Sequence, residues 1–402
     1  MQAKAFFKNY TSTLLLLLGL LAGGTVGALL GSKASVLQPV GTIFLNLVFV
    51  LVVPLVFLSV AQSMVVLRRN GMIGKVLGIS FGVFLVMSLL VGILTYGVIL
   101  FWNPFTDVAS SGTAGVIGGF MGESVNIGDA ISGAFTVSDF PMLLSKENLL
   151  PLIVFSSLFG ISVAFLGPAV PTIEKLIFEG SAVIMKMMDL LMKLAPIGIG
   201  CYFAYTVGQL GGQIVGNYLQ IFLLVTFICL FVYVVFNSLY AVFCGIPLGK
   251  FWREMIVPSV TAVGTCSSAA CMPVNIEAAR KLGVSDKIAN GVVPLGTNLH
   301  KDGCIITGIV KILFTLYFFG FNPTGLGTAA LIILISLLCS LVVGAIPIGG
   351  MTGELLICVI LGVDPSFAAT LMIIGTIVDI PATLVNSTGN LVAPLLVDRL
   401  SK

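Results

Sequence analysis

Apolar runs long enough to cross a lipid bilayer recur along the whole chain, and they restrict the possible fold more than any other feature. Many hold about 20 residues or more, and a helix of that length spans a hydrocarbon core of roughly 30 Å. Composition agrees, because 58% of the residues are hydrophobic and only 9% are charged. Soluble domains usually carry about a quarter charged residues. We therefore predict an all-α polytopic protein of the cytoplasmic membrane, and the net charge of +3 gives no indication of a nucleic-acid partner.

The first part of the chain is predicted to form six uninterrupted spans. Their ranges are about 11–31, 38–67, 75–102, 148–168, 174–207 and 216–245. The first run is too long for the apolar region of a signal peptide and lacks a convincing cleavage site. We therefore expect it to be a spanning helix.

Four interrupted apolar segments follow. Segment 252–275 contains the small, polar tract TCSSAAC and then Pro273; 287–318 contains GTNLHKDG; 327–363 contains GAIPIGG; and 366–398 contains DIPATLVNSTGN. Proline stops or kinks a helix, and glycine permits unusual dihedral angles. Backbone groups freed at membrane depth cannot face lipid, so the breaks predict a solute-binding site near the midplane.

The positions of the basic residues predict the topology. We place the N-terminus in the cytoplasm and treat TCSSAAC and GAIPIGG as re-entrant hairpins from the inside and the outside. The basic residues of the loops then lie in the cytoplasm, apart from Lys33 and Lys146. This is the bias of the positive-inside rule, so we expect both termini in the cytoplasm and the loop 103–147 outside.

The four interrupted segments also carry a family resemblance. TCSSAACMP resembles the serine-rich tip of a first hairpin, and PLGTNLHKDG resembles the broken-span motif PLGATINMDG. VGAIPIGG resembles the tip of a second hairpin, and DIPATLVNSTGN resembles the last-helix motif DMGRTMVNVTGD. With these motifs in order over essentially its whole length, the chain is similar to the dicarboxylate/amino acid:cation symporters, the glutamate-transporter family.

The resemblance implies eight transmembrane helices and two re-entrant helical hairpins, arranged as inverted repeats in a homotrimer that works as an elevator. Residues 1–402 would form a single integral membrane transporter domain. Its scaffold, about 11–67 and 148–207, would hold the subunits together. Its mobile transport part, about 75–102 and 216–398, would include hairpin 1 (252–282), span seven (287–318), hairpin 2 (327–363) and span eight (366–398).

The resemblance also implies a substrate site. Asp379 stands where the family binds the amino group of the substrate, and an intramembrane carboxylate is expected to have a cationic partner; helix capping is the alternative role. Thr383 and Asn386 follow on the same helical face, and Asn386 can donate to a carboxylate. Ser267 and Ser268 offer hydroxyl and backbone N–H groups. The expected site comprises Ser267, Ser268, Pro347, Gly350, Asp379, Ala382, Thr383 and Asn386.

One departure from the family bears on the substrate. Ala382 stands where transporters of acidic substrates carry an arginine, which would bind a side-chain carboxylate at two points. We therefore expect secondary active transport of a small, neutral amino acid. Sodium-coupled symport of an acidic amino acid or dicarboxylate is the alternative, and no cofactor is expected.

Other departures affect the sodium sites of the family. Asn390 replaces an aspartate ligand, the only histidine, His300, replaces an asparagine, and Lys301 replaces a methionine. Phe84 and Met87 occupy two oxygen-donor positions in the third helix. The ion-site equivalents are Ser88, His300, Lys301, Asp302, Asn386, Asn390 and Glu354. We expect sodium coupling to be lost or reduced, because no sodium site retains its full set of ligands.

The three adjacent ionisable residues of GTNLHKDG allow two interpretations. Lys301 could act as a built-in cation, paired with Asp302 or with Glu354, while His300 carries a proton near physiological pH. Alternatively, the three residues form a static network that holds the break together.

Two other functional classes remain open on the sequence. An intramembrane hydrolase could use Ser267 or Cys266 as nucleophile and His300 as base, but no third orienting group is evident. A channel could be lined by the broken helices. The order of the motifs favours a carrier that is not an enzyme.

Overall fold

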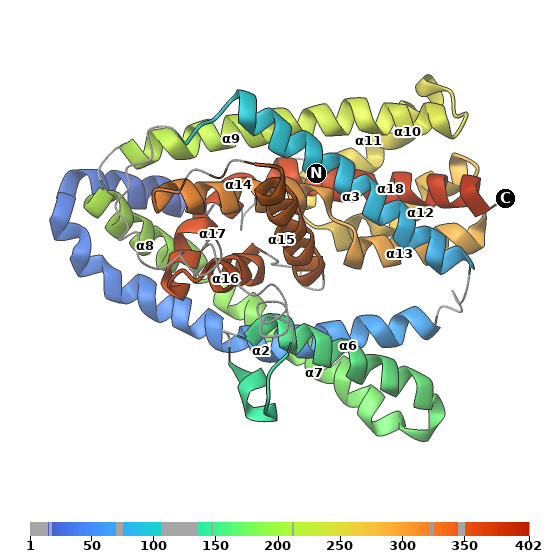
Figure 1. Cartoon of the computed structure of the whole chain (residues 1–402), viewed down its shortest axis with the longest axis horizontal. Helices are drawn as coiled ribbons and strands as arrows, with labels where there is room; N and C mark the ends of the chain where they lie inside the picture. The colour runs from blue at the N-terminus through green and yellow to red at the C-terminus, as the bar shows by residue number, and fades with distance from the viewer. Residues whose placement is uncertain are drawn as a thin grey trace, which may run out of the picture.

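The computed structural model describes residues 15, 18–69, 75–105, 136–145, 148–210, 213–321, 323, 325–344 and 350–401. Within these ranges the chain forms helices joined by turns and short 3₁₀ segments, and no strand (Figure 1). In a helix every backbone polar group away from the ends is satisfied within the segment, which a lipid environment requires. The predicted all-α class is confirmed for the described residues.

Most of the uninterrupted spans lie close to their predicted ranges. Residues 18–30 are helical, followed by the 3₁₀ segment η1 (Gly31–Leu37). The next three spans are α2 (Gln38–Arg69), α3 (Lys75–Phe101) and α6 (Leu149–Leu166). The sixth runs without interruption through α9 (Gln213–Phe231), the π-helical segment η5 (Val232–Phe236) and α10 (Asn237–Phe243).

The span predicted at 174–207 is two helices, so its prediction as one element was wrong. After the 3₁₀ segments η2 (Phe140–Leu144) and η4 (Gly167–Ala169), the chain forms α7 (Pro171–Met192) and then α8 (Ala195–Leu210). A turn at Lys193 and Leu194 separates them. Pro196 is the second residue of α8, a position where its missing N–H is not needed by the helix. The chain therefore breaks just before this proline.

The next two interruptions fall where the sequence predicts them, and the third prediction, GAIPIGG, lies largely outside the described residues. α11 (Leu248–Thr265) and α12 (Ser268–Lys281) pack against each other and are joined by Cys266 and Ser267. Cys266 takes a left-handed conformation with φ of 47°, which allows the tight reversal. α13 (Asp286–Leu299) and α14 (Asp302–Phe318) flank the second break. α15 (Leu326–Gly344) and α16 (Gly350–Leu361) flank residues 345–349, which lie outside the described ranges.

The last interruption differs from its prediction. After η6 (Pro365–Phe367) comes α17 (Ala368–Ile377). A turn at Val378 follows, and α18 (Asp379–Ser401) begins at the next residue. DIPATLVNSTGN is therefore helical throughout, and the predicted break within it was wrong. Pro381 lies in the first turn of α18, where proline is tolerated. Neither Gly303 nor Gly389 has a positive φ, so the unusual dihedrals expected at these glycines are also absent.

The helices form two groups, one around α2 and one around α18, and the second group contains the broken helices α11 to α14. α2 packs against α6, α7 and α8 along one side of the molecule (Figure 1). α18 packs against α3 and against α11 to α14. Every residue from Pro381 to Asp398 is buried, although α18 is the least apolar of the long helices, with a mean hydropathy of 1.3. Its polar side chains are therefore held inside protein.

Among the described residues, five helical segments are long and apolar enough to cross a membrane: 18–66, 75–101, 151–169, 216–243 and 379–401. The breaks make the remaining helices shorter. Several apolar spans are thus present, while the count of eight, the elevator arrangement and the division into scaffold and transport parts stay predictions.

Candidate functional site

At the break between α13 and α14, the side chains of the neighbouring residues His300 and Lys301 point in opposite directions. His300 has an extended backbone with φ of −123° and ψ of 109°, and Lys301 follows with φ of −141° and ψ of 82°. Successive side chains of an extended segment point to opposite sides. Lys301 accordingly lines a cavity, whereas His300 stacks on Phe84 of α3, with 5.1 Å between ring centroids. Asp302, at the first position of α14, places its negative charge where the helix dipole favours it.

Several of the predicted ion-site equivalents gather on the His300 side of the break. The Asp302 Oδ1 lies 3.1 Å from His300 Nε2 and accepts a hydrogen bond of 3.2 Å from Ser88 Oγ. Asn390 of α18 is also buried here, and a Cβ placed on Gly296 would lie 2.6 Å from its Oδ1. The arrangement puts the His300 imidazole next to the Asp302 carboxylate.

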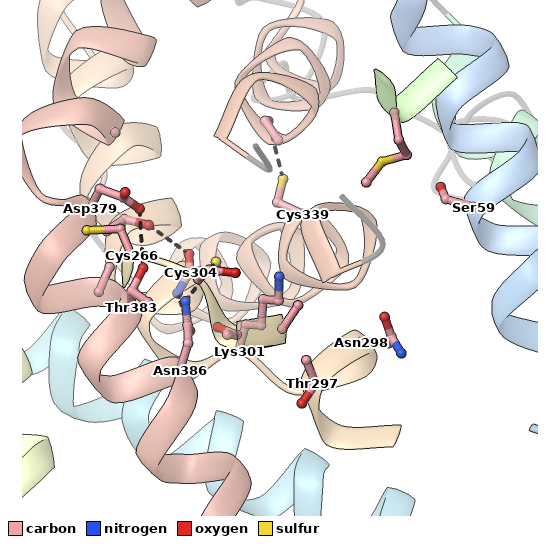
Figure 2. Close-up of a pocket in the computed structure, with 18 of the residues that line it drawn as sticks. Ser59, Cys266, Thr297, Asn298, Lys301, Cys304, Cys339, Asp379, Thr383 and Asn386 are labelled. Atoms are coloured by element: carbon pink, nitrogen blue, oxygen red, sulfur yellow. Dashed lines mark hydrogen bonds between the residues drawn. The ribbon is translucent and has the colours of Figure 1, made fainter. Parts of the chain in front are cut away.

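Most of the predicted substrate residues line one cavity of about 470 Å³. One wall comes from α2 and α7 through residues such as Ser59 and Met185, and the other from the broken helices (Figure 2). The predicted substrate residues that line the cavity are Ser267, Ser268, Asp379, Ala382, Thr383 and Asn386. Lys301, predicted as an ion-site equivalent, lines it as well. The cavity therefore lies between the two groups of helices.

α18 supplies three polar side chains to this cavity. Asp379 opens onto it, and Thr383 Oγ1 donates to Asp379 Oδ1 at 3.3 Å. Asn386 Oδ1 accepts from the backbone N–H groups of Gly303 at 2.8 Å and Cys304 at 3.3 Å. Its Nδ2 lies 3.5 Å from Cys304 Sγ. Asn386 thus connects the start of α14 to α18 through hydrogen bonds. The sequence predicted Asn386 as a donor to the substrate but did not predict this structural role.

Both serines of the first hairpin tip line the cavity, and the tip of the second hairpin lies outside the described residues. The Ser267 hydroxyl accepts from the N–H of Ala270 at 3.3 Å and so caps α12. The N–H of Ser267 in turn donates to Thr265 Oγ1 at 3.3 Å. Pro347 lies outside the described residues. Gly350 is the first residue of α16, and Gly353 of the same helix lines the cavity.

A second buried lysine lines the cavity, and the sequence analysis missed it. Lys311 of α14 forms an ion pair with Glu354 of α16, and both side chains are buried. The expected pairing of Glu354 with Lys301 is therefore wrong, because Glu354 is the partner of Lys311. A lone lysine within the apolar run IITGIVKILF was the available signal, since an intramembrane charge usually has a partner.

The cavity combines charges of both signs. Lys301 and Lys311 both line it and both interact electrostatically with the Asp379 carboxylate. Two ammonium groups in a low-dielectric site attract carboxylates strongly, and Asp379 can accept from an ammonium group. The arrangement fits a small solute that carries carboxylates.

Comparison with known proteins places the chain among transporters. The family model described as the sodium:dicarboxylate symporter family matches residues 13–400. The C4-dicarboxylate transport protein 1 of Mesorhizobium japonicum is 27% identical, over 98% of this chain and 83% of that protein. The C4-dicarboxylate transport protein of Paracoccus denitrificans is also 27% identical, over 95% of this chain and 85% of that protein.

Proposed function

Because the chain belongs to the sodium:dicarboxylate symporter family, we propose that it carries small dicarboxylates across the cytoplasmic membrane. Membership makes it a multi-pass secondary transporter and not an enzyme, which removes the hydrolase considered on the sequence. We further propose that both termini lie in the cytoplasm and that three copies assemble through the scaffold helices.

The observation that carries the substrate proposal is the pair of lysines on one cavity wall. The neutral amino acid was expected because Ala382 replaces an arginine. Lys301 and Lys311 supply two cationic groups to the cavity that Ala382 also lines. The relatives named above are C4-dicarboxylate transport proteins, which agrees with this chemistry. We therefore replace the neutral amino acid with a compact dicarboxylate.

We also propose that transport does not require sodium. His300 Nε2 lies 3.1 Å from Asp302 Oδ1. In our proposal the imidazole occupies the space beside this oxygen that a bound sodium ion would need. Imidazole and lysine are not oxygen donors, and sodium is held by oxygen ligands. Sodium is therefore not part of the proposed cycle.

A thermal-shift experiment on the purified chain in detergent tests the substrate. Ligands stabilise the state they bind, so succinate and L-aspartate are expected to raise the melting temperature, and L-alanine and L-serine are not. Replacing Lys301 with Met should abolish the succinate shift. The matched control Lys250→Met, at an exposed position of α11, should keep it. Stabilisation by L-alanine or L-serine without any effect of succinate would restore the neutral amino acid and overturn the proposal.

A further inference from the structure

The pair formed by Lys311 and Glu354 lies at the edge of the cavity and has an asymmetric setting. Lys311 lines the cavity, whereas the side chain of Glu354 is 0% exposed and is not part of the cavity lining. Glu354 Oε1 faces the lysine, and Oε2 has no hydrogen-bond partner among the described residues. An incoming solute can therefore reach the ammonium group of the pair but not its carboxylate.

Gly375 of α17 packs closely against the other side of the pair. A Cβ on Gly375 of α17 would lie 2.9 Å from Glu354 Oε1 and 3.0 Å from Lys311 Nζ. Gly375 itself lines the cavity. A side chain at this position would collide with the pair, so Gly375 leaves room for both charged groups at the edge of the cavity.

We propose that the substrate opens this ion pair: one substrate carboxylate replaces Glu354 beside Lys311, and Glu354 takes up one proton. The inference rests on the proposed transport of dicarboxylates. No covalent bond of the substrate changes, and the proton comes from water that reaches the cavity. In the empty carrier the pair is neutral, and after binding the neutral glutamic acid stands beside a lysine paired with the substrate. One proton therefore accompanies each dicarboxylate.

The proton uptake follows from burial. A fully buried carboxylate without a counter-ion is strongly unfavourable. Glu354 is therefore expected to take up a proton when the Lys311 ammonium group pairs with the substrate instead. The ionisable groups that face Glu354 are Lys311 from α14, Cys339 from α15 and Cys358 from its own helix. Lys301 and Asp379 lie on the same cavity. Of these, Asp379 is the competing proton acceptor, because a neutral thiol or a lysine ammonium has no basic site to fill.

Calorimetric titration of the purified full chain with succinate near pH 7, in sodium-free buffers of different ionisation enthalpy, counts the protons. The wild type is expected to take up about one proton per succinate. Glu354→Gln should bind succinate at least as tightly with no proton uptake, because no internal anion competes for Lys311. The double variant Lys311→Met/Glu354→Gln, which leaves no unpaired buried charge, should bind at least about tenfold more weakly than Glu354→Gln.

Control variants separate the outcomes. Glu277→Gln removes an exposed glutamate that pairs with Lys281 at 2.8 Å and should leave the proton count unchanged. Proton uptake that persists in Glu354→Gln but disappears in Asp379→Asn would overturn the inference, as would equal affinities in the double variant and Glu354→Gln. Succinate binding without proton uptake in the wild type contradicts the inference alone. A wild type that binds no dicarboxylate overturns the proposed function and the inference with it.

Discussion

At the scale of single residues, Asp379 is the group that should distinguish a plain dicarboxylate from an amino dicarboxylate. It opens onto the cavity and accepts one hydrogen bond from Thr383, which leaves acceptor capacity for an ammonium group. A hydrogen bond to a charged group contributes about 1.5–3 kcal/mol. Asp379→Asn should therefore weaken L-aspartate about tenfold or more relative to succinate, as measured by calorimetry. Equal losses for both ligands would show that Asp379 has only a structural role.

Sequence and structure agree on which residues are unusual but not on what these residues contact. The run His300, Lys301 and Asp302 predicted a break, and the break is present. At the break, the side chain of His300 lies against α3 and that of Lys301 lines the cavity. These opposite directions depend on backbone angles and not on sequence spacing. The partner of Lys311 is 43 residues away in sequence. Only the packing of α14 against α16 brings the two charges together.

At the scale of the elements, the start of α14 depends on its close approach to α18. A Cβ on Gly303 would overlap the backbone carbonyl of Ala382, and the N–H of Gly303 donates to Asn386. Gly303→Ala should therefore destabilise the protein by about 1–3 kcal/mol or more, because backbone has to move. Thermal denaturation in detergent measures this effect. The control Gly97→Ala in α3, where a Cβ meets nothing within 4 Å, should be neutral or stabilising; similar losses in both variants would contradict the argument.

The helices themselves were largely predictable, because apolar length determines a membrane span. The errors concern how proline and glycine act. Pro196, near the start of α8, follows an interruption that the sequence prediction missed. Pro381 was predicted to interrupt a helix but lies in the first turn of α18. Gly303 and Gly389 lie within helices and allow close contact with other segments. A Cβ on Gly389, for example, would lie 3.2 Å from His300 Cε1. A sequence pattern does not tell a glycine needed for contact from one needed for its backbone angles.

At the scale of the whole molecule, the cavity lies between α2 and α7 on one side and the broken helices on the other. An elevator would move the second group past the first and take the bound solute with it. Lys301, Lys311, Glu354 and Asp379 all belong to the broken helices or to α18. In such an elevator the charges proposed to bind the solute and take up the proton would travel together, so solute and proton would cross the membrane in the same step.

This arrangement predicts which gradient drives uptake into proteoliposomes. With choline in place of sodium, an acidic exterior should make the wild type accumulate succinate above its external concentration, because each dicarboxylate enters with a proton. An inward sodium gradient at uniform pH should add nothing, because sodium is not part of the proposed cycle. Glu354→Gln should equilibrate succinate without accumulating it, because the carrier keeps its lysines and loses the proton acceptor. Accumulation that needs sodium in the wild type would show that the altered site still binds the ion, and the sodium-free cycle would then be wrong.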